Sequence, residues 1–483
     1  MDLPDLRRDA AAPLVDQLVD HYRAAIREGR VRPGDRLPTI RAVASGAGVT
    51  RATVEGAYRR LQTLGLVAAT VGRGTVVCGD AEPNVLSPGA RAALDHLSQQ
   101  PMPAAQPDAI DLAQLSPDHA LFPAVDFAES LQRVLARRGS ELLGYGQPTG
   151  DLELRRLLAA MTDTPPEQAI EHILVTNGAQ QGLDLVLRAF TRPGDAVAVP
   201  VPTYHHLLGL LKAQELRAVP VRGSADGIDL DDLARVLGRD DVRLLYLMPT
   251  FRNPTGSTLD LAQRQRLVEI VARTTVPVLE DEFDLDLRFR GAPLPSLFRL
   301  DPRQLTVTVR TFSKGLFPGV RLGWVHAGPE VFAPLAALKR YIDLETSPLL
   351  QAALVDFLRS GAADRHLTAL RDEVRDRHAA AQQALEQHMP DGFRWTRPDG
   401  GFALWVEGPP GFDGIRLAQA AAERGVLVAP GCLFHPSDAS VPGVRVSLCR
   451  AGGQQVRTGI EILGRCAAEL LGPASPSRQP FLL

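Results

Sequence analysis

The chain has 483 residues, of which 45% are hydrophobic and 23% are charged, a composition typical of globular proteins with more than one domain. No apolar run approaches the roughly 20 residues of a membrane-spanning helix, and the N-terminus lacks the basic and apolar regions of a signal peptide. We therefore expect a cytoplasmic protein. The four cysteines have no CxxC spacing, which argues against a structural zinc site and against a disulfide framework.

The net charge of −3 is distributed unevenly along the chain. Residues 10–78 hold ten arginines and five acidic residues, so this segment carries +5 and the remaining residues together carry −8. A basic segment joined to an acidic remainder predicts an anionic partner, such as nucleic acid, for that segment alone.

Residues 10–78 have the pattern of a helix-turn-helix followed by a wing. Apolar residues recur at helical spacing over residues 14–26, which predicts an amphipathic helix. A glycine turn separates two further helices, which Thr39 and Thr50 are predicted to cap. The segment 67–77, which contains a Gly-Arg-Gly turn, predicts two strands.

This basic segment closely resembles the winged helix-turn-helix of the GntR regulators in the phrases RVRPGDRLPTIRAVASGAGVTRATVEGAYRRLQTLGLV and GRGTVV. The resemblance implies DNA binding, with the start of the recognition helix in the major groove and arginines and backbone N–H groups on the phosphates. The residues that it places at the DNA are Arg41, Arg51, Thr53, Arg59, Arg73 and Gly74. The alternative is that these arginines only keep helix surfaces soluble.

Residues 79–108 are rich in proline, alanine and serine, and contain one weakly helical stretch at 91–97. This composition predicts a linker between independently folded units. A linker of this length leaves open whether the DNA-binding head lies against its own body or against that of a partner subunit.

Beyond the linker, short apolar runs alternate with amphipathic helices, which predicts an α/β domain whose mainly parallel sheet is covered on both faces. The predicted strands begin near residues 173, 196, 217, 244, 276, 306 and 322. Ligands of such sheets bind at the carboxyl ends of the strands. Candidate site residues are therefore expected directly after these runs.

Lys314 is one of only three lysines in a chain with 53 basic residues. An amine can lose its proton and form a Schiff base with an aldehyde, which a guanidinium group cannot do. Lys314 lies in the sequence TFSKGLFPGVRLGW, seven residues before Arg321, and glycines flank both side chains. The alternative is an ordinary solvated lysine.

Three further motifs follow or lie near predicted strands. The turn at Gly178, Ala179 and Gln180 opens a helix, so its backbone amides and the helix dipole are suited to a phosphate group. Asn253 begins the sequence NPTG, and Asp281 lies in a run of five carboxylates. No histidine lies near this run, which argues against a metal site and leaves a solvated acidic loop as the alternative.

Together these motifs resemble the fold-type I aminotransferases, which bind pyridoxal 5'-phosphate (PLP). The cofactor-binding residues that the resemblance implies are Gly178, Ala179, Gln180, Tyr204, Asn253, Asp281, Ser313, Lys314 and Arg321. Lys314 would hold the cofactor as an internal aldimine, and Arg321 would bind its phosphate. Tyr204 would stack on the ring, Asn253 would bind the ring hydroxyl oxygen, and Asp281 would keep the pyridine nitrogen protonated.

Two positions bear on effector binding and on catalysis. Arg445, in the sequence GVRVSLCR, resembles the family's arginine that receives the α-carboxylate of an amino acid, and Arg450 is the second candidate. Relatives commonly have a tyrosine two residues after the aspartate, where this chain has Phe283. The resemblance therefore implies that one hydrogen bond to the cofactor oxygen is missing, which weighs against full aminotransferase activity.

The combination of a GntR-like head, a linker and a fold-type I aminotransferase-like body resembles the MocR/GabR family of PLP-dependent transcriptional regulators. The implied parts are a winged helix-turn-helix (10–78), a linker (79–108), a large PLP-binding domain (109–345), a small α+β domain (346–470) and a tail (471–483). The resemblance implies a homodimer that binds operator DNA and senses PLP or an amino compound.

Two alternatives remain open at the level of the sequence. An active aminotransferase with an appended head would turn over an amino acid and would show no sequence-specific DNA binding. A DNA-binding repressor with an inactive body would bind no PLP. The set of Asn253, Asp281, Lys314 and Arg321 argues against the second alternative.

Overall fold

The computed structural model describes residue 6 and residues 13–27, 30–32, 34–63, 65–70, 74–78, 86–100, 108–223, 227–437 and 441–472. The chain divides into two compact units, Met1–Arg91 and Ala92–Leu483. No helix in the described ranges combines the length and the apolar character that a membrane span requires.

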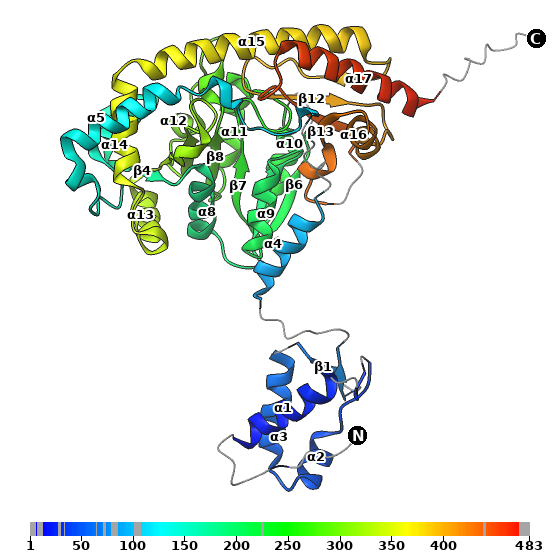
Figure 1. Ribbon diagram of the computed structural model, residues 1–483. Coiled ribbons are helices and arrows are strands. Elements are labelled where there is room, and N and C mark those ends of the chain that lie inside the picture. The colour runs from blue at the N-terminus through cyan, green and yellow to red at the C-terminus, as the bar shows by residue number, and fades with distance from the viewer. Residues whose placement is uncertain are drawn as a thin grey trace, which may run out of the picture. The chain divides into compact units, whose positions relative to one another are not determined.

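The described residues of the first unit form a helical domain with a small sheet. Its elements are α1 (Leu14–Arg27), α2 (Ile40–Gly46), α3 (Arg51–Thr63), β1 (Val67–Thr70) and β2 (Gly74–Val77) (Figure 1). The Thr39 side chain accepts a hydrogen bond from the Ala42 N–H at 3.2 Å, and Thr50 accepts one from the Thr53 N–H at 3.2 Å. Both predicted caps are therefore present at the starts of α2 and α3.

A common apolar core holds this domain together. Leu18 and Tyr22 of α1 pack with Val43 of α2 and with Val54 and Tyr58 of α3, and all five are buried. The strands β1 and β2 pair antiparallel, as the Gly-Arg-Gly turn predicts. The head is thus the winged helix-turn-helix that the sequence predicts.

The second unit contains a seven-stranded sheet. Its strands lie in the order β4 (Ile173–Thr176), β10 (Gly323–His326), β9 (Thr306–Thr311), β8 (Val278–Glu282), β7 (Val242–Leu247), β5 (Ala196–Pro200) and β6 (Arg217–Val221). Only β10 runs antiparallel to its neighbours in this sheet, and the other pairs are parallel. The expected α/β body with a mainly parallel sheet is confirmed.

Helices cover both faces of this sheet. One face packs against α8 (Ala179–Phe190), α9 (His205–Ala213) and α13 (Pro329–Asp343), and the other against α10 (Leu230–Leu237), α11 (Leu261–Ala272) and α12 (Leu297–Leu300). Side chains alternate along β8, so Leu279 packs on the first face and Val278 on the second. The same alternation directs the neighbouring carboxylates of Asp281 and Glu282 to opposite faces.

A second sheet of five strands forms the smaller part of the body. Its order is β11 (Arg394–Trp395), β12 (Ala403–Glu407), β14 (Gly443–Ser447), β13 (Val426–Pro430) and β3 (Ile110–Leu112). The helices α15 (Ala362–His388), α16 (Gly414–Ala422) and α17 (Gly453–Leu471) cover it, and α15 and α17 lie side by side (Figure 1). Because β3 pairs with β13, residues 110–112 belong to this sheet and not to the large domain that the sequence predicts over 109–345.

The remaining described elements connect these layers. The helices are α4 (Pro88–Ser98), α5 (Ala124–Leu142), α6 (Leu152–Ala160), α7 (Pro166–Ala169) and α14 (Pro348–Arg359), and the short 3-10 turns are η1 (His119–Leu121), η2 (Ile170–His172), η3 (Leu285–Leu287), η4 (Pro318–Val320) and η5 (Gly431–Phe434). The helical stretch expected in the linker is α4. The other linker residues, 79–85 and 101–107, and the tail from residue 473 lie outside the described residues.

Candidate functional site

A cavity of about 600 Å³ lies beyond the carboxyl ends of the central strands of the large sheet. The predicted site residues that line it are Ala179, Gln180, Tyr204, Asn253, Asp281, Ser313, Lys314, Arg321 and Arg445. Gly178 directly precedes α8 at the same edge of the sheet. The fold therefore brings residues separated by up to 332 positions in the chain, Ala113 and Arg445, to one site.

Asp281 lies on β8 at the floor of this cavity and is buried. Its Oδ2 atom accepts a hydrogen bond from the Tyr246 hydroxyl at 2.9 Å, whereas its Oδ1 atom has no hydrogen-bond partner. Burial raises the pKa of Asp281 to about 7, because the charged form loses its hydration. A protonated ring nitrogen would supply both the missing donor and a compensating positive charge, so this position fits a pyridinium ring.

The opposite end of the cavity has the features of a phosphate site. Gly178 precedes α8 with a φ of +82°, and a Cβ atom there would lie 2.7 Å from the Nη2 atom of Arg321. Arg321 is exposed and its Nη2 donates to the Asn177 carbonyl oxygen at 3.3 Å. The Thr311 and Ser313 hydroxyl groups lie 2.9 Å apart nearby. A glycine turn, a helix N-terminus and a guanidinium group together fit an anionic phosphate.

Lys314 follows β9 and is half-buried in the cavity wall. Its Nζ atom donates a hydrogen bond to the Leu115 carbonyl oxygen. Leu115 belongs to the segment 113–116, which also lines the cavity and which the sequence does not indicate as part of a site. The segment follows β3, so its position depends on the pairing of that strand with β13, which no local motif reveals.

Arg445 is 2% exposed and lines the same cavity from β14. Its Nη1 atom donates to Asn253 Oδ1 at 2.9 Å, its Nη2 atom donates to the Ala113 carbonyl oxygen, and its guanidinium group lies 4.9 Å from the centre of the Phe434 ring. Its Nε atom is buried without a hydrogen-bond partner. Burial lowers the pKa of Arg445 to about 10. A carboxylate ligand would compensate this buried charge.

Arg450, the second candidate for carboxylate binding, does not line the cavity. Its Nη1 atom forms an ion pair with Asp111 Oδ2 at 3.0 Å, and 37% of its side chain is exposed. The same atom contacts Gln114 Oε1 at 3.4 Å, so Arg450 touches a residue of the cavity wall without lining the cavity itself. Phe283 does line the cavity, where it presents an apolar ring.

Two adjacent histidines on α9, which no motif indicates, also line the cavity. The rings of His205 and His206 are 4.0 Å apart, and burial lowers the pKa of His205 well below its usual value. The Tyr246 hydroxyl, which bonds Asp281, was not predicted either. Tyr246 lies within an apolar strand, and the sequence alone does not indicate that its hydroxyl group donates to Asp281.

The head presents a different kind of candidate site. Arg41, Arg51 and Arg59 are exposed on α2 and α3, and Thr53 shares a hydrogen bond of 2.8 Å with the Thr50 hydroxyl. Gly74 is exposed at the start of β2 with a φ of +83°. Arg73, which was also predicted to contact DNA, lies outside the described residues.

Two family models match the chain. The model described as aminotransferase class I and II matches residues 107–462, and the model described as bacterial regulatory proteins, gntR family, matches residues 14–77. The first match covers more than half of the chain and includes both sheets of the body.

Relatives with both parts align over most of their length. An HTH-type transcriptional regulator of Escherichia coli, YdcR, is 30% identical, and the alignment covers 94% of this chain and 99% of the relative. A probable rhizopine catabolism regulatory protein, MocR, of Rhizobium meliloti is 30% identical, with 88% of each chain covered. A 2-aminoadipate transaminase of Thermus thermophilus is 34% identical and covers 76% of this chain.

The body also matches solved structures. The α-aminoadipate aminotransferase LysN from Thermus thermophilus, in complex with N-(5'-phosphopyridoxyl)-L-leucine, superimposes with a TM-score of 0.72 at 31% identity. The match covers 80% of this chain and 98% of LysN. The fit of the cavity to a pyridinium ring and a phosphate agrees with the PLP dependence of this fold. The chain therefore belongs to the MocR-like family, in which a GntR-type winged helix-turn-helix is joined to a PLP-binding body of the class I and II aminotransferases.

Proposed function

We propose that this protein is a PLP-dependent transcriptional regulator that binds operator DNA through its head and senses PLP or an amino compound in its body. The observation that carries the proposal is the presence in one chain of an arginine-bearing recognition helix and a complete cofactor cavity. A metabolic transaminase has no evident use for a recognition helix. A repressor that senses no ligand has no evident use for a cofactor cavity.

Different cavity residues would bind different parts of the cofactor and of the effector. PLP supplies an aldehyde and an electron-withdrawing ring when it is bound. Lys314 offers the amine for the aldehyde, Asp281 holds a proton at the ring nitrogen, and the start of α8 with Arg321 binds the phosphate. Tyr204, which lines the cavity, would offer its ring to the cofactor, and Arg445 would bind the carboxylate of an amino acid.

We further propose that the protein acts as a homodimer. Tyr145 and Tyr341 are 87% and 90% exposed, and an apolar residue, Leu344, is exposed close to the latter. The Gly146 N–H donates to the Glu345 carboxylate, so the segments that carry these three exposed side chains lie side by side. We infer that a second copy of the chain buries them, because large exposed apolar and aromatic side chains on neighbouring segments mark protein interfaces. Sedimentation analysis should give a mass of two chains.

The segment that carries Leu344 also contacts the residue before the glycine turn at α8. Asp343, directly before Leu344, accepts a hydrogen bond from the Asn177 amide at 2.6 Å, next to the phosphate end of the cavity. Binding of a ligand there can therefore affect the contact between two copies. A coupling free energy of about 1–3 kcal/mol between the effector and DNA sites suffices for a useful switch.

The alternative, an active aminotransferase, is disfavoured by Phe283, which offers no hydroxyl group to the cavity. An amino-acid effector should change the visible spectrum of the PLP-bound protein quickly, while the release of keto acid should be slow. Turnover of about 1 s⁻¹ or faster with any common amino acid would favour the enzyme, because this rate lies in the ordinary range of enzymes.

The test of the main proposal is to sequence the genomic DNA that the purified protein retains, with and without PLP. A regulator should enrich a small set of sites with paired half-sites, and PLP or the effector should change the occupancy of these sites. Retention of random fragments in both conditions would contradict the proposal.

A further inference from the structure

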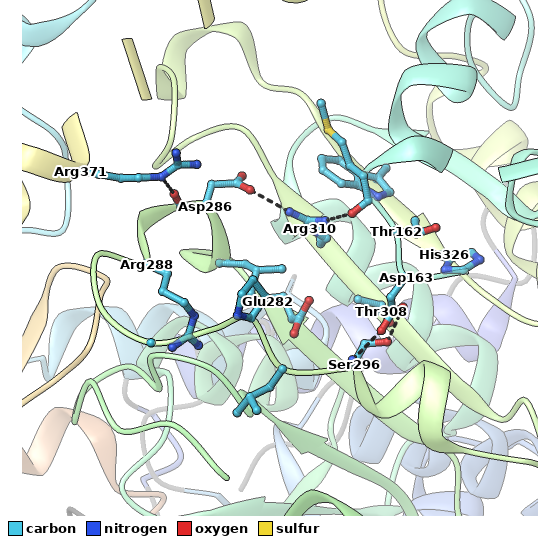
Figure 2. Close-up of a pocket in the computed structure, with 16 residues that line it drawn as sticks. Thr162, Asp163, Glu282, Asp286, Arg288, Ser296, Thr308, Arg310, His326 and Arg371 are labelled. Atoms are coloured by element: carbon cyan, nitrogen blue, oxygen red, sulfur yellow. Dashed lines mark hydrogen bonds and ion pairs between the residues drawn. The ribbon is translucent and has the colours of Figure 1, made fainter. Parts of the chain in front are cut away.

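A second cavity, of about 570 Å³, lies on the other face of the large sheet. Figure 2 shows Glu282, Arg288, Arg310 and His326 among the side chains that surround it. Neither the proposed cofactor chemistry nor the DNA-binding head uses these residues.

The two cavities are separated by the strands β8 and β9. Asp281 lines the cofactor cavity, and its neighbour Glu282 lines the second one. On β9, Thr308 and Arg310 line the second cavity, and Thr311 lines the cofactor cavity. This division follows from the alternation of side chains along a strand. A ligand in the second cavity would therefore touch the same two strands that position the cofactor.

Most of the charged groups around the second cavity are paired. Arg310 donates to Asp286 Oδ1 at 3.1 Å, and the Asp163 carboxylate accepts hydrogen bonds from the Ser296 N–H and hydroxyl groups at 2.7 and 2.9 Å (Figure 2). The Nε atom of Arg371 donates to the Asp286 carbonyl oxygen at 2.7 Å. These groups form the frame of the cavity and need no further partner.

Two groups of opposite charge have no ion-pair partner among the described residues. The Nε and Nη2 atoms of Arg288 are buried and have no hydrogen-bond partner, whereas its Nη1 atom donates to the Arg290 carbonyl oxygen at 3.4 Å and its guanidinium group lies 4.7 Å from the centre of the Phe251 ring. Glu282 is 5% exposed, and the contact that it accepts within the described part of the chain is a long one of 3.5 Å from the Thr250 hydroxyl. Leaving such groups unpaired is costly, because buried polar atoms lose their hydration without compensation.

The chemistry of a fitting ligand follows from these two groups. The Nε and Nη2 atoms of an arginine form the edge that binds a carboxylate with two parallel hydrogen bonds. A buried glutamate in turn favours an ammonium group. Met161, Leu285, Leu294 and Trp324 supply apolar parts of the wall, next to the paired polar groups described above.

We propose that this cavity is a second ligand site that takes an α-amino acid with an apolar side chain, with the carboxylate on Arg288 and the ammonium group on Glu282. The site is distinct from the cofactor cavity and does not depend on the proposed regulatory function. Through β8 and β9, its occupant would stabilise one arrangement of Asp281 and Lys314.

The test is equilibrium dialysis of radiolabelled L-leucine against the full-length, PLP-bound protein after borohydride reduction has fixed the cofactor on Lys314. The reduction prevents the probe from exchanging at the cofactor. We expect saturable binding of one leucine per chain. The carboxylate-only analogue 4-methylpentanoate and the amine-only analogue 3-methylbutylamine should each bind at least about tenfold more weakly, because each leaves one buried charge unpaired.

Substitutions locate the bound probe. Arg288→Met and Glu282→Gln should each weaken leucine binding by about tenfold or more. The matched control is Arg290→Met, since Arg290 lies two residues away, is exposed and pairs with Asp399. The analogue series on the unaltered protein gives an independent answer if a variant fails to fold.

Three outcomes would overturn the proposal. The first is an absence of saturable leucine binding up to millimolar concentrations, and the second is equal binding of leucine and both analogues. The third is binding that Arg445→Ala abolishes and Arg288→Met does not change, because this result would place leucine in the cofactor cavity.

Discussion

The head and the body use their arginines in opposite ways. Arg41, Arg51 and Arg59 of the head are exposed, whereas Arg445 of the body is 2% exposed and donates hydrogen bonds to Asn253 and to a backbone carbonyl. Exposed cations that bind phosphates contribute in small, salt-screened increments. A buried cation in a cavity determines by itself whether a ligand fits. A single substitution in the cavity of the body should therefore abolish ligand binding. A single substitution in the head should weaken DNA binding only in part.

The largest expected effect is that of Lys314→Ala. The purified protein should be yellow because of PLP bound through Lys314, and the variant should lose this visible absorbance after gentle dialysis, since no other lysine lines the cavity. Lys212→Ala, at an exposed lysine on α9, is the matched control and should keep the spectrum. An unchanged spectrum of Lys314→Ala would show that Lys314 does not hold the cofactor.

The next effect concerns the effector. Arg445→Ala should abolish the spectral change that an amino-acid effector induces, while PLP stays bound, because Lys314 donates to Leu115 and Arg321 to Asn177, so neither depends on this guanidinium group. Arg450→Ala should respond like the unaltered protein, since Arg450 pairs with Asp111 and does not line the cavity. Stopped-flow spectra with a panel of amino acids measure both variants. A loss of response in Arg450→Ala alone would reverse the assignment of the two arginines.

The contrast between the two regions also explains what the sequence could predict. Motifs whose residues are close in the chain, such as the caps at Thr39 and Thr50 or the turn before α8, were read correctly because their geometry is local. The same holds for the order of strands and helices, which follows from hydrophobic periodicity.

Features that depend on contacts between distant segments could not be read. The pairing of β3 with β13 places Leu115 beside Lys314, and the ion pair of Arg450 with Asp111 keeps that arginine out of the cavity. The second cavity depends on Arg288, whose unpaired edge is visible only when the surrounding side chains are in place. Single-sequence patterns contain no information on such contacts.

A smaller effect is expected when the head is separated from the body. Residues 1–80 alone should bind duplex DNA weakly and with a steep dependence on salt, because each neutralised phosphate releases counterions. The full-length protein should bind an operator far more tightly if the body dimerises and presents two heads together. Fluorescence anisotropy at several salt concentrations compares the two proteins. Equal affinity at moderate salt would contradict a dimer that binds two half-sites.

A further graded effect is the pH dependence of stability of the cofactor-free protein. Burial raises the pKa of Asp281 and of Asp284 to about 7, above the value of an unfolded chain. The folded state therefore favours the protonated carboxyl groups, and the contribution of these two groups to stability should fall as the pH rises from about 5 to 7. Each group contributes roughly 2 kcal/mol over this range.

Thermal unfolding at several pH values measures this dependence. Asp281→Asn should remove the contribution of Asp281 to the change of stability with pH. Bound PLP should reduce this contribution as well, because a protonated ring nitrogen beside Asp281 favours the charged carboxylate. Burial lowers the pKa of His326 and of His378 to about 4, which gives the opposite dependence on pH, so the test is the difference between the variant and the unaltered protein. The same dependence of the melting temperature on pH in Asp281→Asn and in the unaltered protein would contradict the raised pKa of Asp281.

The smallest expected effect distinguishes two adjacent arginines of α3. Arg59 is exposed, and its guanidinium group is expected at a DNA phosphate, whereas Arg60 forms an ion pair with Asp16 of α1. Arg59→Ala should weaken operator binding by a few-fold to about tenfold and lower the slope of log affinity against log salt by about one, as the loss of one phosphate contact does. Arg60→Ala should leave the salt slope unchanged and cost less than about 1 kcal/mol of stability, because exposed ion pairs contribute little. Because the two residues are neighbours on one helix, a salt slope that changes in Arg60→Ala and not in Arg59→Ala would show that the side of α3 that carries Arg60 meets the DNA.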